Sequence, residues 1–464
     1  MKNKLDFTKN LQTAIIAQGV NVIFSCIVSL ILPKFLGVEQ YSYWQLFIFL
    51  TTYSGALHFG LSDGIYLRYG GEVIENIDYR LIGSQLKIMN FVHIVFCVIV
   101  SIFLCATLPC NERLSVYIFA MVFTIIANAT WFLGYVFQAT NLTRIFSHSV
   151  MILNGSFLLF LSFLCFTKQK SFKWYCFCYV IAMFLSLVYI SIKGKKIVFS
   201  GLVPMSFALN EIKSNIIIGI NLTIANVASS LILGIGRIVV DRTEGITSFG
   251  LLSLALSLTN FFLQFILQVS MVLFPALRRL SNEMIKRTFV ILQDNIGFVL
   301  YGILVLYIPI KKILLLWLPS YSESFYYMVF LLPICVFDGK MQLLYGTFMK
   351  VLRREKELFR YNIIALMVSF ILCLVSAFYF HNIIFVAISM TTAIFVRYLI
   401  SCIHLNMYYS IRYEKRIMFE VVMTSVFVIS NLLLEEINAF LLMICLYGCY
   451  IFNNRSYLSK LVKK

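Results

Sequence analysis

Long apolar stretches alternate with short charged links along this chain of 464 residues. Fourteen of these stretches are about long enough to cross a bilayer, because a spanning helix needs roughly 20 mostly apolar residues. The pattern therefore predicts an all-α integral membrane protein with about 14 transmembrane helices. The predicted spans are residues 11–32, 44–62, 88–109, 115–139, 146–166, 174–192, 216–236, 247–275, 290–310, 325–346, 361–380, 382–403, 417–434 and 438–453.

The composition leaves no room for a soluble domain of ordinary size. The chain is 61% hydrophobic and 12% charged, and its mean hydropathy is +0.90. No link on the outer side is longer than about a dozen residues, and the P-loop pattern GxxxxGK[ST] does not occur. The sequence therefore predicts neither an outer catalytic domain nor ATP hydrolysis, and we expect that the protein is not an enzyme. The twelve cysteines show no metal-ligand spacing, so we expect no metal site.

The placement of basic residues predicts the orientation in the membrane. Of the 38 Lys and Arg residues, 27 fall in the segments on the side of the N-terminus and 9 fall on the other side. Cytoplasmic links carry the excess of Lys and Arg, so both termini are expected in the cytoplasm. Lys168 and Lys170, on a predicted outer link, are a local exception. The net charge of +18 needs no nucleic acid as a partner, because anionic membrane lipids attract such residues.

A short internal repeat indicates that the chain has two related halves. A cation, a glycine, a β-branched residue and an aromatic residue recur at a constant offset of 208 residues. The aligned pairs are Lys34 and Arg242, Gly37 and Gly245, Val38 and Ile246, and Tyr41 and Phe249. Six predicted spans separate the two copies, and an even number gives both halves the same orientation, as in transporters with parallel repeats.

The repeat predicts two pseudo-symmetric six-helix lobes around a central cavity. We expect an N-lobe at residues 1–205, a C-lobe at 206–410 and an additional C-terminal helix pair at 411–464. Two such lobes can support alternating access by rocking against each other. The competing interpretation is a compact bundle without a pathway, and the charges within the spans argue against it.

Two charged residues in the tenth predicted span are the clearest candidates for a functional site. Asp338 and Lys340 lie more than halfway along this span, with Gly339 between them to loosen the helix. Ionisable groups inside a membrane cost about 2.5–3.5 kcal/mol each and tend to mark pathways or partners. Residues two apart do not face each other on a helix, so each should meet water or another helix. A purely structural interhelical pair is the alternative.

Other cations lie near the ends of predicted spans. Arg237 and Asp241 are four residues apart at the outer end of the seventh span and can pair. Arg242 follows them and matches Lys34, so both cations could produce a positive potential at an outer mouth between the lobes. Arg397 lies deeper in the twelfth span. For Lys34, Arg242 and Arg397, snorkelling to the interface is the competing explanation. For Arg237, the alternative is a structural role as the partner of Asp241.

Three carboxylates and an arginine lie near other span ends. Asp63 and Arg68 follow the second span within a glycine-rich run, where they could form a cytoplasmic gate or contact lipid headgroups; an ordinary helix end is the alternative. Glu420 and Asp294 lie near the starts of predicted helices, where a carboxylate suits the positive end of the helix dipole. We therefore interpret Glu420 and Asp294 as structural.

Several runs resemble one family of membrane transporters. LGVEQYSYWQL at 36–46 and HFGLSDGIYLRYGG at 58–71 are similar to bacterial polysaccharide-unit flippases of the Wzx type. These proteins form the polysaccharide transporter branch of the multidrug/oligosaccharidyl-lipid/polysaccharide exporter (MOP) superfamily. Residues 249–254, 273–279 and 314–321 are similar to later segments of the same family.

The resemblance implies a function in surface polysaccharide synthesis. A protein of this family would carry undecaprenyl-pyrophosphate-linked oligosaccharide units from the inner to the outer leaflet of the bacterial cytoplasmic membrane. Its partners would include membrane lipids, a polysaccharide polymerase and chain-length machinery, for capsule, O-antigen or another surface polymer. A cationic cavity of the kind described for the family would fit Arg237, Lys340 and Arg397. No cofactor is expected, and the coupling ion, H⁺ or Na⁺, stays open.

Two other functions remain as alternatives. A MATE-like cation-coupled multidrug exporter would share the fold but would need acidic cavity residues, whereas cations are at least as frequent here in and beside the spans. A membrane polysaccharide polymerase would need a sizeable outer catalytic loop, which the pattern of links does not contain.

Overall fold

The structure, a computed structural model, describes residues 2–277 and 280–453. Every regular element in these ranges is a helix, which confirms the all-α class. Eleven of the described helices are long and apolar enough to cross a membrane, or twelve if one bent pair counts as a single span. The protein is therefore a multi-pass membrane protein. The predicted C-terminal end at 454–464 and Met1 lie outside the described residues.

The expected number of fourteen spans is not confirmed, and two regions explain most of the difference. The first predicted span and the first part of the second lie in one long helix, α1 (Lys2–Thr52), on either side of Gly37, which has non-helical φ and ψ of 72° and 170°. The second predicted span continues beyond Thr52. The last predicted span corresponds to α17 (Glu436–Asn453), whose apolar part, Glu436–Phe452, is shorter than the other spans.

The chain divides into two compact units, Met1–Val227 and Ala228–Lys464. The boundary lies inside the 39-residue helix α8 (Met205–Thr243), whereas the sequence placed it at the start of that helix. The predicted lobes and the cavity between them stay predictions.

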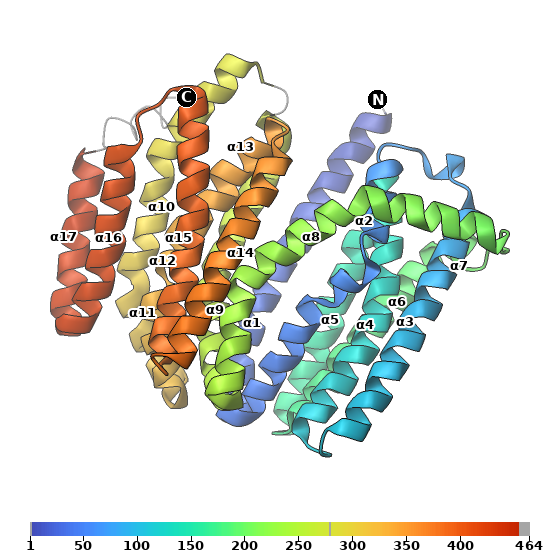
Figure 1. Cartoon of the computed structure of the whole chain (residues 1–464), viewed down its shortest axis with the longest axis horizontal. Helices are drawn as coiled ribbons and strands as arrows, with labels where there is room; N and C mark the ends of the chain where they lie inside the picture. The colour runs from blue at the N-terminus through green and yellow to red at the C-terminus, as the bar shows by residue number, and fades with distance from the viewer. Residues whose placement is uncertain (1, 278–279, 454–464) are drawn as a thin grey trace. The chain divides into compact units, whose positions relative to one another are not determined.

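The first unit contains the following elements in chain order: α1, η1 (Ser54–His58), α2 (Leu61–Arg68), η2 (Ile74–Asn76), α3 (Tyr79–Thr107), α4 (Glu112–Ala139), α5 (Thr143–Phe166), α6 (Phe172–Lys193), α7 (Lys195–Val198) and the first part of α8. Helix α4 packs against α3, α5 and α6, and α1 packs against α4 and α5 (Figure 1). Trp44 is 1% exposed and stacks on Phe157, with ring centroids 5.6 Å apart. This aromatic pair is part of the core of the first unit.

The second unit contains the rest of α8 followed by α9 (Gly245–Leu277), α10 (Asn282–Trp317), η3 (Pro319–Tyr321), α11 (Ser322–Leu331), α12 (Pro333–Lys340), the π-helical turn η4 (Met341–Tyr345), α13 (Gly346–Val351), α14 (Glu355–Phe378), α15 (Ile383–Tyr409), α16 (Glu414–Leu433) and α17. Helix α12 packs against α9, α10 and α15, which places it in the interior of this unit. All eight of its side chains are buried.

The tenth predicted span is broken rather than straight. Residues Pro319–Leu331 and Pro333–Val351 meet at an angle of 46°. Pro333 explains the bend, because proline lacks the backbone N–H that would continue the helix and its ring clashes with the preceding turn. Gly339 does not loosen the helix as expected. It stays helical and allows close packing, since a Cβ there would lie 2.9 Å from Ile266 Cδ1 and Leu300 Cδ2. The π-helical turn begins two residues later, at Met341.

The two copies of the internal repeat have matching local structures. Gly37 and Gly245 both have positive φ, 72° and 86°, where side chains other than glycine are strained. Tyr41 and Phe249, four residues later, are both fully buried. Each copy therefore joins two helices through a left-handed glycine that is followed by an aromatic anchor. This agreement supports the interpretation of the repeat as a real structural correspondence.

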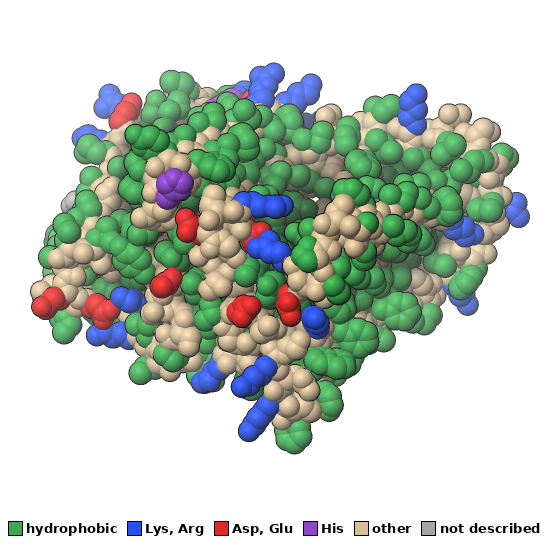
Figure 2. All heavy atoms as spheres, turned by 60° about the horizontal axis from the view of Figure 1, so that its bottom comes forward, with side chains coloured by type: hydrophobic (Ala, Val, Ile, Leu, Met, Phe, Trp, Pro, Cys, Tyr) green, Lys and Arg blue, Asp and Glu red, His purple; other side chains and the backbone are tan. Residues whose placement is uncertain are grey.

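Many apolar side chains are exposed on the surface, as a lipid-facing protein requires. On α3, Phe91, Ile99, Ile102 and Phe103 are each more than 60% exposed. Figure 2 shows hydrophobic side chains covering much of the visible face, with charged side chains gathered in parts of it. Apolar patches of this extent are rare on monomeric soluble proteins.

Candidate functional site

Helix α12 carries the two charges that the sequence singled out, and both are buried. Asp338 is 5% exposed and Lys340 is 3% exposed. Asp338 forms an ion pair with Arg397 of α15, and Lys340 forms one with Glu420 of α16. The two residues do not pair with each other but meet different helices, which confirms the expectation from their spacing. Helix α12 is thus tied to two neighbouring helices by ion pairs of opposite polarity.

Several polar groups hold Arg397 in place. One guanidinium nitrogen donates to Asp338, and the other donates to Ser229 Oγ at 3.0 Å and to Asn362 Oδ1 at 3.4 Å. The Asp338 carboxylate also accepts a hydrogen bond of 2.5 Å from the Gln342 side chain. Arg397 is 5% exposed, so snorkelling to the interface does not describe its position.

Lys340 and Glu420 lie in an aromatic environment. Tyr398 Oη donates to one Glu420 oxygen, while the Lys340 ammonium donates to the other. Lys340 Nζ also lies 5.6 Å from the centroid of the Tyr301 ring. Glu420 is 3% exposed and comes six residues after the first residue of α16. It is therefore not in the first turn, and our interpretation of Glu420 as a helix-start residue was wrong.

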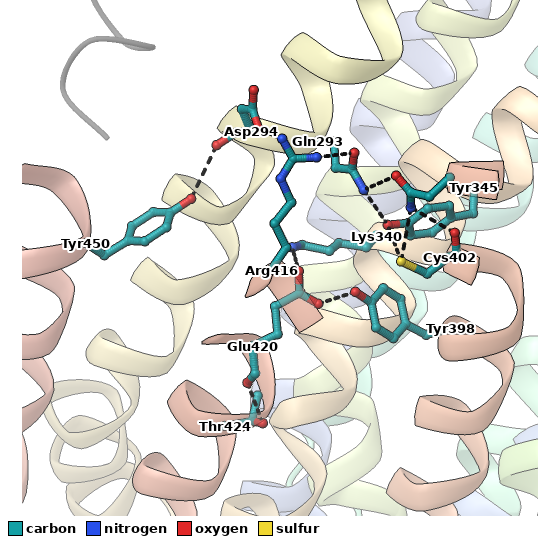
Figure 3. Close-up of polar contacts among 11 residues, drawn as sticks. Gln293, Asp294, Lys340, Tyr345, Tyr398, Cys402, Arg416, Glu420, Thr424 and Tyr450 are labelled. Carbon is teal, nitrogen blue, oxygen red and sulfur yellow. Dashed lines mark hydrogen bonds and ion pairs between the residues drawn. The ribbon is translucent and has the colours of Figure 1, made fainter. Parts of the chain in front are cut away.

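A hydrogen-bonded network extends from this pair toward the start of α16 (Figure 3). Tyr398 contacts Cys402, whose Sγ also accepts from Tyr345 Oη at 3.2 Å. The Gln293 amide links Tyr345 to Arg416. Its Nε2 donates to Tyr345 Oη at 3.3 Å, and its Oε1 accepts a 2.5 Å hydrogen bond from the Arg416 guanidinium. Arg416, whose side chain is 32% exposed, completes the network at this end.

Asp294 lies at that same end of the network. Its carboxylate forms an ion pair of 2.5 Å with Arg416, and its backbone oxygen accepts a hydrogen bond from Tyr450 Oη at 3.3 Å. Asp294 comes twelve residues after the first residue of α10, so it does not neutralise the start of that helix as the sequence suggested.

The remaining cations of the candidate set lie elsewhere in their units. Arg237 Nε donates to Ser253 Oγ at 2.9 Å, and its guanidinium lies over the ring of Phe249, 5.0 Å from the centroid. Asp241 is 9% exposed, whereas Arg242 and Lys34 are exposed. Lys34 belongs to the first unit and Arg242 to the second, so their joint role at an outer mouth stays a prediction.

The first unit contains a second polar cluster, centred on Asp63 of α2. Asp63 is 3% exposed and accepts a hydrogen bond from Thr223 of α8. His58 Nε2 lies 4.0 Å from the same carboxylate, and Tyr135 is within hydrogen-bonding contact. The burial shows that Asp63 is not at an ordinary exposed helix end.

Arg68 lies at the other end of α2 and also contacts α8. Its guanidinium forms an ion pair of 2.5 Å with Glu211 and a longer contact of 3.4 Å with Asn215 Oδ1. The hydrogen bond to Glu211 raises the pKa of the Arg68 guanidinium.

Glycines bring α2 close to the first part of α8. A Cβ on Gly64 would lie 1.9 Å from the backbone oxygen of Asn215, and one on Gly219 would lie 2.0 Å from the backbone oxygen of Gly60. Asn215, Gly219 and Thr223 are spaced by four residues, so they share one face of α8. The two backbones therefore touch directly, and the polar contacts of Asp63 and Arg68 lie on either side of the glycine contact.

Comparisons with known proteins identify the fold. The chain resembles a structure of the lipid II flippase MurJ in an inward closed conformation, with 13% identity, a TM-score of 0.69 and coverage of 99% of both chains. It also resembles an inward-facing multidrug resistance MATE family transporter of the MOP superfamily, with 11% identity, a TM-score of 0.61 and coverage of 87% of this chain and 98% of the other. A MOP superfamily transporter from Pyrococcus furiosus Vc1 (DSM3638) matches with 10% identity, a TM-score of 0.53 and coverage of 87% and 95%.

This chain has the MOP transporter fold. Neither the protein-family models nor the curated proteins gave a match, so the likeness is one of structure rather than of sequence. The comparison confirms the expected fold, while membership of the superfamily and of its Wzx branch stays a prediction. These three similar structures belong to two transporters and one flippase.

Sequence reasoning found most of the charges buried in the second unit of this MOP fold but missed the role of Glu420. One signal could have revealed Glu420. It is a carboxylate within the predicted span 417–434, and this span follows a link rich in basic residues. Among residues 2–277 and 280–453, no group of three or more His, Cys, Asp or Glu side chains is placed to hold a metal ion.

Proposed function

We propose that this protein is a flippase for undecaprenyl-pyrophosphate-linked oligosaccharide repeat units. It would move them by alternating access from the inner to the outer leaflet of the bacterial cytoplasmic membrane, for capsule, O-antigen or another surface polysaccharide. The observation that carries this proposal is the extent of the structural likeness. The flippase structure covers 99% of this chain, whereas the MATE structure covers 87%.

The difference in coverage is about an eighth of the chain, which is the size of the C-terminal segment 411–464. This segment contains α16 and α17, and α16 supplies Glu420 and Arg416 to the buried network. A fold that includes this helix pair, together with the basic character of the chain, favours a flippase over a multidrug exporter.

The chemistry of the substrate also supports the proposal. A pyrophosphate head carries negative charge, and arginine and lysine bind phosphate groups through charge-assisted hydrogen bonds. We assign Arg237, Lys340, Arg397, Arg242 and Lys34 to substrate binding, and Asp63, Arg68, Asp241 and Asp338 to gating or coupling. Because Lys340 and Arg397 already have carboxylate partners, they would have to exchange them for phosphate oxygens during transport.

A multidrug exporter for cations is less well supported by these contacts. Such a protein needs carboxylates that can accept a cationic drug, but Asp338 and Glu420 are each neutralised by a buried cation of the chain itself.

A gene deletion tests the proposed function. Loss of the gene should cause the lipid-linked repeat unit to accumulate on the inner leaflet and should abolish the surface polymer, and the intact gene should restore both. Normal levels of surface polymer in the deletion strain, or sensitivity to cationic drugs as the main effect, would contradict the proposal. If the proposal holds, crosslinking in the intact membrane should join the protein to the proposed partners, a polymerase and chain-length machinery.

A further inference from the structure

The ion pair between Lys340 and Glu420 differs from the other buried pair on α12 in a way that suggests a switch. We propose that Glu420 is a proton-binding site and that a proton on Glu420 releases Lys340 to bind the anionic head of the substrate. The release of Lys340 to a substrate anion rests on the proposed function, since it needs an anionic substrate. Proton binding by Glu420 does not depend on that function, and it assigns the coupling ion to a particular carboxylate.

The contacts of Glu420 leave its charge dependent on a single cation. Each carboxylate oxygen accepts one hydrogen bond, from Lys340 Nζ and from Tyr398 Oη. Within the part of the chain that the structure describes, Glu420 is the carboxylate that forms an ion pair with Lys340. A protonated Glu420 can still share a hydrogen bond with Tyr398, but it no longer balances the ammonium charge.

Removing this balance has a large effect because both groups are 3% exposed. A buried ammonium without a counter-charge is unfavourable, so Lys340 must find another anion or leave the interior. The Tyr301 ring, 5.6 Å away, offers a weaker cation–π contact that does not replace a carboxylate. Protonation of Glu420 is therefore linked to anion binding by Lys340.

The neighbouring pair has the opposite character. Arg397 is held by Asp338, Asn362 and Ser229 together, and its guanidinium cannot lose its proton. Protonation of Asp338 would still leave Arg397 with two hydrogen-bond acceptors. That pair is therefore held by more contacts than the pair of Lys340 and Glu420, in which the ammonium has one carboxylate partner.

The groups around Glu420 make it the natural place for a proton. The hydroxyl, thiol and charged groups that surround it come from α10, α12, η4, α15, α16 and α17. They are Asp294, Tyr301, Lys340, Tyr345, Tyr398, Cys402, Arg416 and Tyr450. The other carboxylate of this set, Asp294, is paired with an arginine, so Glu420 is the acid whose partner is a lysine.

The start of α16 is the proposed entry for the proton. Glu420 follows the first residue of the helix by six positions, or about 9 Å along the axis. Arg416, one turn earlier on the same face, has a side chain that is 32% exposed. The proton would pass from water at this end to the carboxylate, with no other bond made or broken. The charged link before α16 places this end on the predicted cytoplasmic side.

Proton uptake on ligand binding tests the switch directly. The purified full-length protein in detergent and weak buffer would be mixed with undecaprenyl pyrophosphate while an indicator dye reports the protons taken up. The wild type should take up about one more proton per bound ligand than Glu420→Gln, which has the shape of the protonated acid. Comparison of the two variants cancels any protonation of the ligand itself. Equal uptake by both would overturn the inference and leave the proposed function intact.

A matched control and a second measurement complete the test. Glu436 pairs with Lys311 at 2.7 Å but has a side chain that is 44% exposed, so Glu436→Gln should take up protons like the wild type. If Glu420→Gln does not fold, infrared difference spectra of the wild type should show a carboxylic-acid band that rises when ligand is added. Absence of this band would overturn the inference. Failure of the wild type to bind undecaprenyl pyrophosphate at all would instead contradict the proposed function.

Discussion

Lys340 of α12 and Glu420 of α16 form a buried ion pair across 80 residues of sequence. Both side chains are almost inaccessible to solvent, so the pair ties the C-terminal helix pair to the interior of the second unit. Breaking a buried ion pair by removing one partner is strongly destabilising, so this pair gives the clearest predictions about stability.

Loss of one partner should be worse than loss of both. Lys340→Met leaves the Glu420 carboxylate buried without a counter-charge, which we expect to lower the free energy of unfolding by about 3–5 kcal/mol. The double variant Lys340→Met/Glu420→Leu removes both charges and should recover most of that loss. Melting of the purified protein in detergent measures the difference. A double variant as unstable as the single one would show that the ion pair is not the source of the stability.

The glycine contact between α2 and α8 should tolerate no side chain. In Gly64→Ala the new Cβ would lie 1.9 Å from the backbone oxygen of Asn215, so the two helices must separate and the melting temperature should fall. Gly155→Ala, in the interior of α5, is the matched control because no atom lies within 4 Å of its Cβ position. That control should be neutral or stabilising by up to about 1 kcal/mol, since alanine favours helix more than glycine does.

Arg237 should affect transport without unfolding the protein. A charge-assisted hydrogen bond to a substrate anion is worth about 1.5–3 kcal/mol, and 1.4 kcal/mol is tenfold in an equilibrium constant. Arg237→Ala should therefore reduce surface polysaccharide transport by about one to two decades at matched protein levels. Arg237→Lys keeps the charge but loses the bond to Ser253 and should be intermediate.

A structural role for Arg237 predicts a different pattern. If its importance lies in pairing with Asp241, Arg237→Ala should lower protein abundance, and Arg237→Ala/Asp241→Ala should restore it. Wild-type polysaccharide output from Arg237→Ala would remove this residue from the transport pathway.

The predicted orientation can be tested by labelling. In a cysteine-depleted background, Lys195→Cys should react with a membrane-impermeant thiol reagent only after the cells are permeabilised. The reason is that its link is rich in Lys and Arg and is predicted to lie in the cytoplasm. Glu435→Cys should react in intact cells. Both positions are exposed, so burial does not prevent labelling. Labelling of Lys195→Cys in intact cells would contradict the two-lobe arrangement.

The fold was largely accessible from the sequence, because its main signals are local. Apolar length identifies spans regardless of packing. The glycine–aromatic repeat predicted an equivalent corner between helices in each unit. The break at Pro333 was not anticipated because the apolar pattern of the tenth span continues through the bend. The count of fourteen spans is not confirmed for a related reason. Hydropathy separates residues 11–32 from residues 44–62, whereas the structure has one candidate span there with a kink at Gly37.

The site was only partly accessible, because charge partners depend on distant helices. The spacing of Asp338 and Lys340 indicated that each meets another helix, and both do. Nothing in a single sequence links Lys340 to a residue 80 positions away, and Glu420 was assigned to a helix terminus because α16 begins earlier than hydropathy suggests.

The matching corners at Gly37 and Gly245 have a consequence for ancestry. A left-handed glycine and a buried ring four positions later occur at the same place in both halves, 208 residues apart. Such a coincidence is the expected trace of an ancient gene duplication whose two products have since diverged almost everywhere else. Because backbone sterics admit only glycine readily at that position, this corner outlasts the drift of the surrounding side chains. Distant kin of the protein should be recognisable by this paired signature when overall identity no longer reveals them.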